Sequence, residues 1–415
     1  MAVGGLEFLV ALVVVSAILP ALRAVRARQG LLAACSAGLL YSLLPNLISW
    51  LTLGVFVLSG YAVGRALRSR PRPALAGSYL LVLVAAFLLL KQYSFLELLL
   101  PAPWLDHPVA IVGLSYMLFR QIHFLVDSMQ AQIDRPRIWD YLNYQLNPFT
   151  LVAGPIQRFQ DFCGSWHRLE PVPAERHEIL ITWLRILLGS IKIAGLAAAC
   201  LFAHEKIFER MAHYGGPVPP GTAVAQFAAL FYLYPLYLYF NFSGYCDIVI
   251  GAGALLGLRL PENFDRPYLS RNLLDFWTRW HQTLSFWIRD YLFTPTYKAI
   301  AEARPTWAPS LAFACYFLAF LFAGIWHGST TNFVVFGLIH GVGASVVKLW
   351  EMTLVRRRGR AYLRQYLQSR LVRTAAIVLT LHYAGFALLF FPDRLERCLI
   401  PLRVVASSLR LAAFG

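Results

Sequence analysis

Long apolar segments alternate with short arginine-bearing loops along most of this chain. The segments cover residues 6–22, 31–64, 76–90, 109–126, 179–203, 222–257, 311–326, 333–347 and 374–391. Because a helix needs about 20 mostly apolar residues to cross a bilayer, the pattern predicts an all-α polytopic bundle of about nine to twelve transmembrane helices.

Two of these segments are longer than one crossing requires. Residues 31–64 carry no charge and would form about 50 Å of helix, whereas the hydrocarbon core is about 30 Å thick. We therefore expect a hairpin over 31–64 that turns near Pro45 and Asn46. Residues 222–257 are likewise long enough for more than one element.

Two further regions, and part of 222–257, do not have the pattern of a plain span. Residues 143–158 are mostly apolar but contain Gly154 and Pro155, which favours a re-entrant or interfacial piece packed against protein. Residues 258–297 mix aromatic, basic and acidic side chains, so we expect them to lie along the interface or to line a cavity. Polar side chains within 222–257 need partners and should face the interior of the bundle; they are Asn241, Ser243, Tyr245 and Asp247.

The composition agrees with a single integral membrane domain over residues 1–415. Hydrophobic residues make up 58% of the chain and charged residues 14%, and no solvated basic domain accounts for the net charge of +16, which argues against nucleic-acid binding. The richest arginine group, at 356–373, is expected at the cytoplasmic lipid surface. We expect a motif core at 141–350, peripheral N-terminal helices at 1–130, and a basic loop and last helix at 351–415.

Histidines stand among the aromatic side chains of two neighbouring stretches. His281 lies in DFWTRWHQTLSFWIRDY (275–291), and His327 and His340 lie in GIWHGSTTNFVVFGLIHG (324–341). An ionisable group at membrane depth is costly and points to a function, and histidine can carry a proton near neutral pH. The two stretches therefore predict chemistry performed inside the membrane.

Three motifs, in this order, resemble the membrane-bound O-acyltransferase (MBOAT) family. They are LVAGPIQRFQDF (151–162), the stretch 237–295 with NFSGYCD and RWHQTLSFWIRDY, and GIWHGSTTNFVVFGLIHG. The match is to the bacterial branch that serves alginate O-acetylation and teichoic-acid D-alanylation. The resemblance implies an enzyme that moves an acyl group from a thioester onto a hydroxyl. It also implies helices around a central tunnel, which donor and acceptor enter from opposite faces of the membrane.

The resemblance assigns catalytic positions to two histidines. His327, in WHG, matches the family's characteristic histidine, and His281, in RWH, matches a second functional histidine. Asn241 stands where the family usually has Asp, and Thr331 stands where an aromatic residue is common. The Gly-Gly that many polysaccharide acetylases have after the Arg-Asp-Tyr motif is absent. These departures bear on the substrate subgroup more than on the type of reaction.

The chemistry of acyl transfer agrees with these positions. Attack of a hydroxyl on a thioester carbonyl needs a base, and a desolvated histidine stays neutral and can accept the proton. We hypothesise that His327 is the general base and that His281 orients a substrate or polarises the thioester oxygen. Further candidates for substrate binding or for support of the histidines are Arg279, Asp290, Asn332, Trp326, Ser243, Tyr245, Asp247 and His340.

Within this set we expect different roles. Arg279, Asp290 and Asn332 are candidates to fix the tautomers of the histidine rings. His340 is expected to pack or to support the site from behind. The six cysteines show no metal spacing and are expected to pack as small hydrophobic side chains. The acidic pair Asp247 and Glu262 has too few ligands nearby, so we expect no metal site.

Substrate and partners follow from the resemblance. We expect an acetyl group from acetyl-CoA, offered on the cytoplasmic side and destined for hydroxyls of an exported or cell-surface polysaccharide. A periplasmic or membrane-tethered partner would complete the transfer. The expected location is the bacterial inner membrane, among its lipids, with no bound cofactor and no nucleic acid. The alternative reaction is D-alanyl or longer acyl transfer from a carrier-protein thioester. The non-enzymatic alternatives are a membrane transporter and a scaffold subunit of an export complex.

Overall fold

A computed structural model describes residues 5–101, 109–170, 176–214, 218–328, 330–392 and 396–414. This part of the chain is helical, apart from loops and one isolated bridge between Phe264 and Trp280. The helices form two compact units. The first comprises Met1–Ser190 with Gly244–Glu262, and the second comprises Ile191–Ser243 with Asn263–Gly415. The expected division into a motif core and peripheral segments stays a prediction.

Six helices of the described residues are long and apolar enough to cross a membrane. They are Leu47–Ser69, Pro73–Leu90, His177–Ala212, Pro220–Leu255, Thr331–Gln368 and Arg370–Leu388. Two shorter apolar helices, Glu7–Ala21 and Leu311–His327, add to them. The all-α polytopic architecture is confirmed, and the count lies below the expected nine to twelve.

The predicted break near Pro45 and Asn46 is confirmed, but the helix before it is not among the candidate spans, so a double crossing over 31–64 stays a prediction. Helix α2 (Val25–Leu43) ends just before Pro45, and α3 (Leu47–Ser69) begins just after Asn46. The Asn46 side chain accepts a hydrogen bond of 2.8 Å from the backbone N–H of Ser49. This N-cap satisfies one donor of the first helical turn, which is why the chain restarts as a helix at this position.

Two apolar segments differ from their expected form. Residues 220–255 form one continuous helix, α11 (Pro220–Leu255), with Pro235 inside it, rather than several elements. The segment 109–126 does not form a span of that extent, because α6 (Leu114–Met129) begins only after Gly113, which has φ 81°. Helix α6 also buries the polar side chains of Arg120, Gln121, His123 and Asp127, so it is an interior helix of the first unit.

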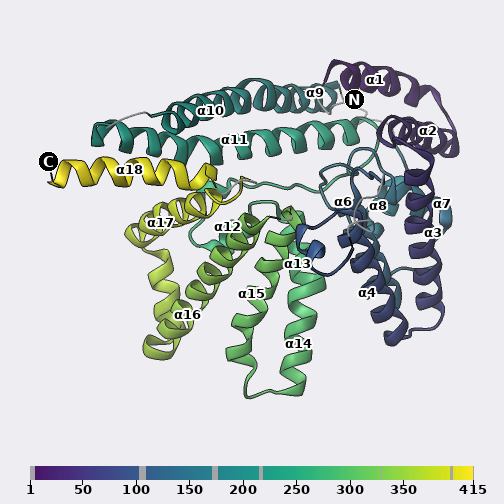
Figure 1. The fold of residues 1–415 in the computed structure, drawn as a ribbon. Helices are drawn as coiled ribbons and strands as arrows, with labels where there is room; N and C mark the ends of the chain where they lie inside the picture. Colours follow the sequence, from purple (N-terminus) through teal and green to yellow (C-terminus); the bar gives the residue numbers. More distant parts are fainter. Residues whose placement is uncertain are drawn as a thin grey trace. The chain divides into compact units, whose positions relative to one another are not determined.

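The first unit contains the irregular segment 146–158, which was expected to be a re-entrant or interfacial piece packed against protein. In Figure 1, α3 and α4 (Pro73–Leu90) lie along α6, and α7 (Ile138–Gln145) and α8 (Phe159–Trp166) lie beside them. The buried Arg120 guanidinium donates from Nη1 to the carbonyls of Tyr144 and Gln145, each at 2.8 Å, and from Nη2 to Thr150 Oγ1 at 2.5 Å. These bonds satisfy the carbonyl end of α7 where the irregular segment 146–158 begins. The prediction that this segment packs against protein is confirmed.

Helix α9 (Arg176–Ile191) runs through a π-helical segment, Lys192–Ala197, into α10 (Ala198–Ala212). Within the first unit, α9 packs closely on the C-terminal part of α11. A Cβ atom on Gly189 would lie 2.6 Å from the carbonyl oxygen of Gly244. Glycine at position 189 therefore permits an approach of the two backbones that a side chain would block.

The second unit contains the histidine motifs. Short helices α12 (Leu273–Trp277) and α13 (Gln282–Ile288) lead through a π-helical turn into α14 (Thr294–Ala303), and none of them is a candidate span. They are followed by α15 (Ala308–His327), α16 (Thr331–Gln368), α17 (Arg370–Leu388) and α18 (Glu396–Phe414). Figure 1 shows α15 and α16 side by side, joined at the end that carries His327.

The α15–α16 hairpin depends on two glycines. A Cβ atom on Gly324 would lie 2.2 Å from the carbonyl oxygen of Phe333, and one on Gly337 would lie 2.5 Å from that of Phe320. Both distances are shorter than any van der Waals contact, and the obstructing atoms belong to the backbone. The two helix axes can therefore come this close only with glycine at these positions.

Replacing Gly337 by alanine should destabilise the hairpin. The added methyl group has to push α15 away, and overpacking of this kind costs about 1–3 kcal/mol of the free energy of unfolding. Thermal unfolding of the detergent-purified variant measures the loss. Gly77→Ala in α4 is the matched control, because a Cβ there meets nothing within 4 Å; equal stability of the two variants would contradict the packing argument.

Candidate active site

His281 occupies a sharp turn between α12 and α13. Its backbone is left-handed, with φ 47° and ψ 50°, and its side chain is 2% exposed. A short antiparallel pairing holds this turn, because Gln282 N–H donates to the carbonyl of Asn263 at 3.0 Å and Asp265 N–H donates to the carbonyl of Arg279 at 2.9 Å. The pairing brings Asn263 opposite His281, although 18 positions separate them in the chain.

The Asn263 side chain sets the tautomer of His281. Its Oδ1 accepts hydrogen bonds from the backbone N–H of Thr283 at 3.2 Å and from Thr283 Oγ1 at 3.0 Å, and His281 Nδ1 lies 3.2 Å away. A backbone N–H can only donate, so the atom facing it is the amide oxygen, which can only accept. The hydrogen of neutral His281 therefore resides on Nδ1, and Nε2 carries a lone pair.

Nε2 of His281 is buried and has no hydrogen-bond partner among the residues that the structure describes. Burial lowers the pKa of His281, which lies outside the candidate spans, well below the usual 6.5, and interaction with nearby His327 acts in the same direction. The ring is therefore neutral at physiological pH. Its Nε2 is suited to accept a proton or a hydrogen bond from a substrate hydroxyl.

His327 is the last residue of α15. Its ring is packed among aromatic rings, with centroid distances of 4.7 Å to Trp326, 4.9 Å to Phe391 and 6.0 Å to Phe336. Gly328 follows it, and a Cβ at that position would lie 2.2 Å from the Phe333 ring. Among the described residues no side chain or carbonyl hydrogen-bonds to the His327 ring, so neither tautomer of this histidine is imposed.

The structure brings His281, Trp326 and His327 together. The Trp326 indole lies 6.1 Å from the His281 ring and 4.7 Å from the His327 ring, centroid to centroid. Phe242 of α11 contacts His281 edge-on at 4.8 Å. The two histidines thus share one aromatic wall within the second unit.

His340 lies on α16, and the Phe336 ring packs against both its imidazole and that of His327. His340 is 1% exposed, and its Nδ1 accepts a hydrogen bond of 3.2 Å from the indole N–H of Trp277. Phe276 stacks on its ring at an interplanar angle of 8°, and the Phe336 ring lies 4.6 Å away. These contacts give His340 the surroundings of a packed histidine with one satisfied nitrogen.

The residues expected to fix the histidine tautomers have other partners. Arg279 Nε donates to Asp275 Oδ1 at 2.8 Å, Asp290 accepts from Arg289 Nε at 2.7 Å, and Asn332 Nδ2 donates to the carbonyl of Pro392 at 2.8 Å. The tautomer-setting side chain is Asn263, which sequence reasoning did not single out. Its position in a loop 18 residues before His281 gave no local signal of the contact.

The polar residues of α11 fall into both units. Ser243 is buried in the second unit, whereas Tyr245 and Asp247 belong to the first. Asp247 accepts from Arg185 Nε at 3.0 Å, and Arg185 also binds Glu262 in a bidentate pair with N–O distances of 2.7 and 2.6 Å. Asp247 and Glu262 therefore form ion pairs with an arginine. For Asp247, the expectation that polar side chains within 222–257 find protein partners is met.

Fold and motifs define a multi-pass membrane enzyme of the acyl-transfer class. The model of MBOAT, the membrane-bound O-acyltransferase family, matches residues 113–359. The chain belongs to this family. Members of this family are enzymes that use thioester acyl donors. Family membership therefore confirms the prediction of an acyltransferase over the alternatives of a transporter or an export scaffold.

The names of similar proteins describe three activities. A teichoic acid D-alanyltransferase of Bacillus subtilis (strain 168) is 27% identical over 70% of this chain and 73% of its own length. The probable alginate O-acetylase AlgI of Pseudomonas fluorescens is 31% identical over 59% of this chain and 46% of its own. A peptidoglycan O-acetyltransferase of Helicobacter pylori (strain ATCC 700392 / 26695) is 28% identical over 59% of this chain and 49% of its own.

The contact between Asn263 and His281 predicts a specific pH effect. In Asn263→Asp a carboxylate would face Nδ1–H and favour the imidazolium, which raises the pKa of His281 by about one to three units. A reaction that uses His281 as its base needs the neutral ring, so its rate is retained above this pKa and is lost as the pH falls through it. The acid limb of kcat/KM should therefore move to higher pH, measured as thiol release from an acyl-thioester donor.

The control for this experiment is Asn272→Asp. Asn272 caps α12 by accepting from Asp275 N–H at 2.8 Å, a role that aspartate also performs, and no hydrogen bond joins it to a histidine ring among the described residues. The acid limb of the kcat/KM profile of Asn272→Asp should stay at the wild-type pH. If the acid limb of Asn263→Asp also stayed there, Asn263 would not act through the His281 ring.

Proposed function

We propose that this protein transfers an acetyl group from cytoplasmic acetyl-CoA toward hydroxyls of an exported or cell-surface polysaccharide. Two of the three activities named among its relatives are O-acetylations, one of alginate and one of peptidoglycan, which supports the acetyl group and the class of acceptor. The proposed location is the bacterial inner membrane. The observation that carries the mechanism is the pair of histidines on one indole, of which His281 offers a buried acceptor nitrogen.

His281 Nε2 is the proposed proton acceptor. As the hydroxyl oxygen of the acceptor forms its bond to the thioester carbonyl carbon, the hydroxyl proton moves to Nε2, and Asn263 stabilises the resulting imidazolium through Nδ1–H. The C–S bond then breaks, the ester is formed, and the proton passes to the departing thiolate. The neutral state of buried His281 before the reaction is what makes it ready to act as base.

His327 is the proposed donor to the developing oxyanion. Because no described residue imposes its tautomer, one ring N–H can point to the thioester oxygen and support the negative charge that forms there. This assignment exchanges the roles expected from the sequence, where His327 was the base. The reason is that the Asn263 contact leaves His281 able only to accept while neutral, so it cannot polarise a carbonyl oxygen.

The aromatic wall has a proposed role in excluding water. Trp326, Phe242 and Phe391 surround the two imidazoles. A dry pocket strengthens the interaction between a histidine N–H and the oxyanion, and it limits hydrolysis of the thioester. Arginines of the cytoplasmic loops would meet the phosphates of the donor. A periplasmic or membrane-tethered protein would receive the acyl group or bring the acceptor.

D-alanyl transfer from a carrier-protein thioester is the second candidate. The observation in its favour is the extent of the similarity, because the teichoic acid D-alanyltransferase of Bacillus subtilis aligns over 73% of its length, whereas the O-acetylases align over less than half. The same two histidines would serve this reaction, since both donors are thioesters and both acceptors are hydroxyls. Donor choice is therefore tested separately from the roles of the histidines.

The first test offers labelled acetyl-CoA and a D-alanyl carrier thioester in parallel to protein in nanodiscs. Turnover of acetyl-CoA by the wild type supports the acetyl assignment, and turnover of the carrier thioester alone replaces it with D-alanyl transfer. His281→Ala and His327→Ala should each lower kcat by about 10²–10⁴-fold, which is the usual contribution of a positioned acid or base. His213→Ala, at the exposed end of α10, is the control and should keep full activity.

The two histidine roles are distinguished by chemical rescue. Added imidazole should restore turnover in His281→Gly, because a diffusible base can replace the lost Nε2. Rescue should be weaker in His327→Gly, where a positioned N–H is missing. Rescue of His327→Gly alone would return the base to His327, and full activity of both alanine variants would remove the pair from the mechanism.

A further inference from the structure

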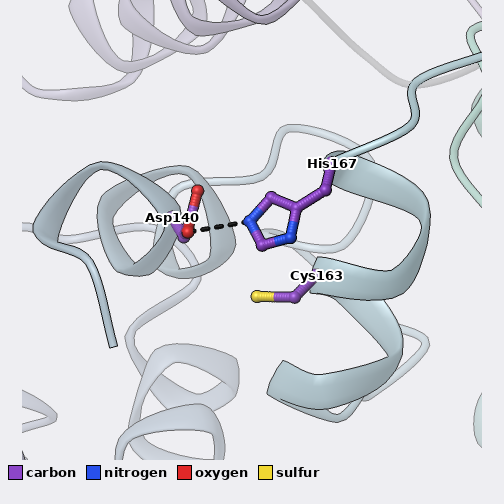
Figure 2. Close-up of side chains that lie close together, drawn as sticks. All are labelled: Asp140, Cys163 and His167. Carbon is purple, nitrogen blue, oxygen red and sulfur yellow. Dashed lines mark hydrogen bonds and ion pairs between the residues drawn. The ribbon is translucent and has the colours of Figure 1, made fainter. Parts of the chain in front are cut away.

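Three metal-ligating side chains meet between α7 and α8 in the first unit. They are Asp140 of α7, Cys163 of α8 and His167 at the end of α8, and one donor atom from each lies within 4.8 Å of the other two. His167 Nε2 is 2.9 Å from Asp140 Oδ2. Figure 2 shows the Cys163 sulfur directed into the same space as the carboxylate and the imidazole.

Helix geometry explains why these donors converge. Cys163 and His167 are four positions apart, which places them one turn apart on the same face of a helix. Helices α7 and α8 pack against each other, so Asp140 is presented to that face. Asp140 is 5% exposed and the His167 side chain is 50% exposed, so the site combines a buried carboxylate with an approach from outside.

We propose that Asp140, Cys163 and His167 bind a divalent transition-metal ion of the zinc type. Thiolate, imidazole and carboxylate are the donors that Zn²⁺ takes in tetrahedral sites. Three protein ligands leave a fourth position for water or for a ligand from outside. This site is independent of the proposed function, because it lies in the first unit whereas the histidine pair lies in the second.

Metal binding would change the protonation of two of these side chains. The Cys163 thiol would release its proton to solvent, one per ion, because the thiolate is the form that binds a metal. The hydrogen of neutral His167 would be held on Nδ1, so that Nε2 could take the ion.

The ion would link α7 to α8, neither of which is a candidate membrane span. Helices α7 and α8 flank the irregular segment 146–158. Its anchors include Arg120 and the hydrogen bond of 2.9 Å from the Tyr144 hydroxyl to the Gln157 carbonyl. A metal bridge from Asp140 to Cys163 and His167 would close this loop at its ends. The expected role is therefore structural, with stability rather than turnover as its direct readout.

The experiment uses the full chain, purified through a tag without histidine and treated with chelator. Co²⁺ is the probe, because a cobalt–thiolate site adds charge-transfer absorption and tetrahedral d–d bands. We expect one Co²⁺ per chain with both features, displaced by Zn²⁺. Cys163→Ser should lose the charge-transfer band, and Asp140→Asn and His167→Gln should each weaken Co²⁺ binding at least about 10-fold. Cys35→Ser, which removes a partly buried thiol of α2, is the matched control.

A second measurement works on the wild type alone, in case a variant does not fold. Zn²⁺ should protect Cys163 from alkylation, measured by mass spectrometry, while alkylation of Cys35 in the same sample is unchanged. It should also raise the temperature of thermal unfolding in the wild type and not in Cys163→Ser. Equal alkylation of Cys163 with and without Zn²⁺, or cobalt spectra without a thiolate band, would overturn the proposal whatever the acyl-transfer activity.

Discussion

Polar groups removed from water need partners within the protein, and this requirement governs how the irregular parts of the chain are built. The segment 146–158 is not helical and does not form the backbone hydrogen bonds of a helix. At its start the buried Arg120 guanidinium supplies hydrogen bonds instead, to two carbonyls and a hydroxyl. The turn at His281 follows the same rule, because one amide, that of Asn263, accepts from its imidazole and from Thr283. In both places the side chain that supplies the bonds is distant in the sequence.

Close packing of helices supplies the other half of the site. Gly324 and Gly337 allow the backbones of α15 and α16 to come into contact. As a result, Trp326 and His327 at the end of α15 lie in a cluster of aromatic rings. A hydrogen-bonded turn thus positions one histidine and a glycine-packed hairpin positions the other. Such rigid support is what a reaction with developing charge requires, since the donors must be in place before the charge forms.

Much of the fold could be predicted from apolar length and helix breakers. The helix break at Pro45 and Asn46 and the packed segment 146–158 follow from rules that act within a few residues, so both predictions succeeded. The continuity of α11 through Pro235 and the interior position of α6 could not be predicted in this way. A proline or a buried arginine is tolerated only when neighbouring elements satisfy the groups it leaves, and those neighbours are known only from the tertiary structure.

The sequence by itself determined the membrane setting, the family and the two histidines proposed to act, because apolar runs and contiguous motifs are local properties of a chain. Only the tertiary structure decided that both histidines adjoin the Trp326 indole, that Asn263 sets the tautomer of His281, and that Asp140 joins Cys163 and His167. Each of these contacts joins side chains on different elements. The geometry of these contacts depends on how helices and loops pack. Hydrophobic periodicity predicts which face of a helix is buried, but it does not predict which side chain a buried polar atom contacts.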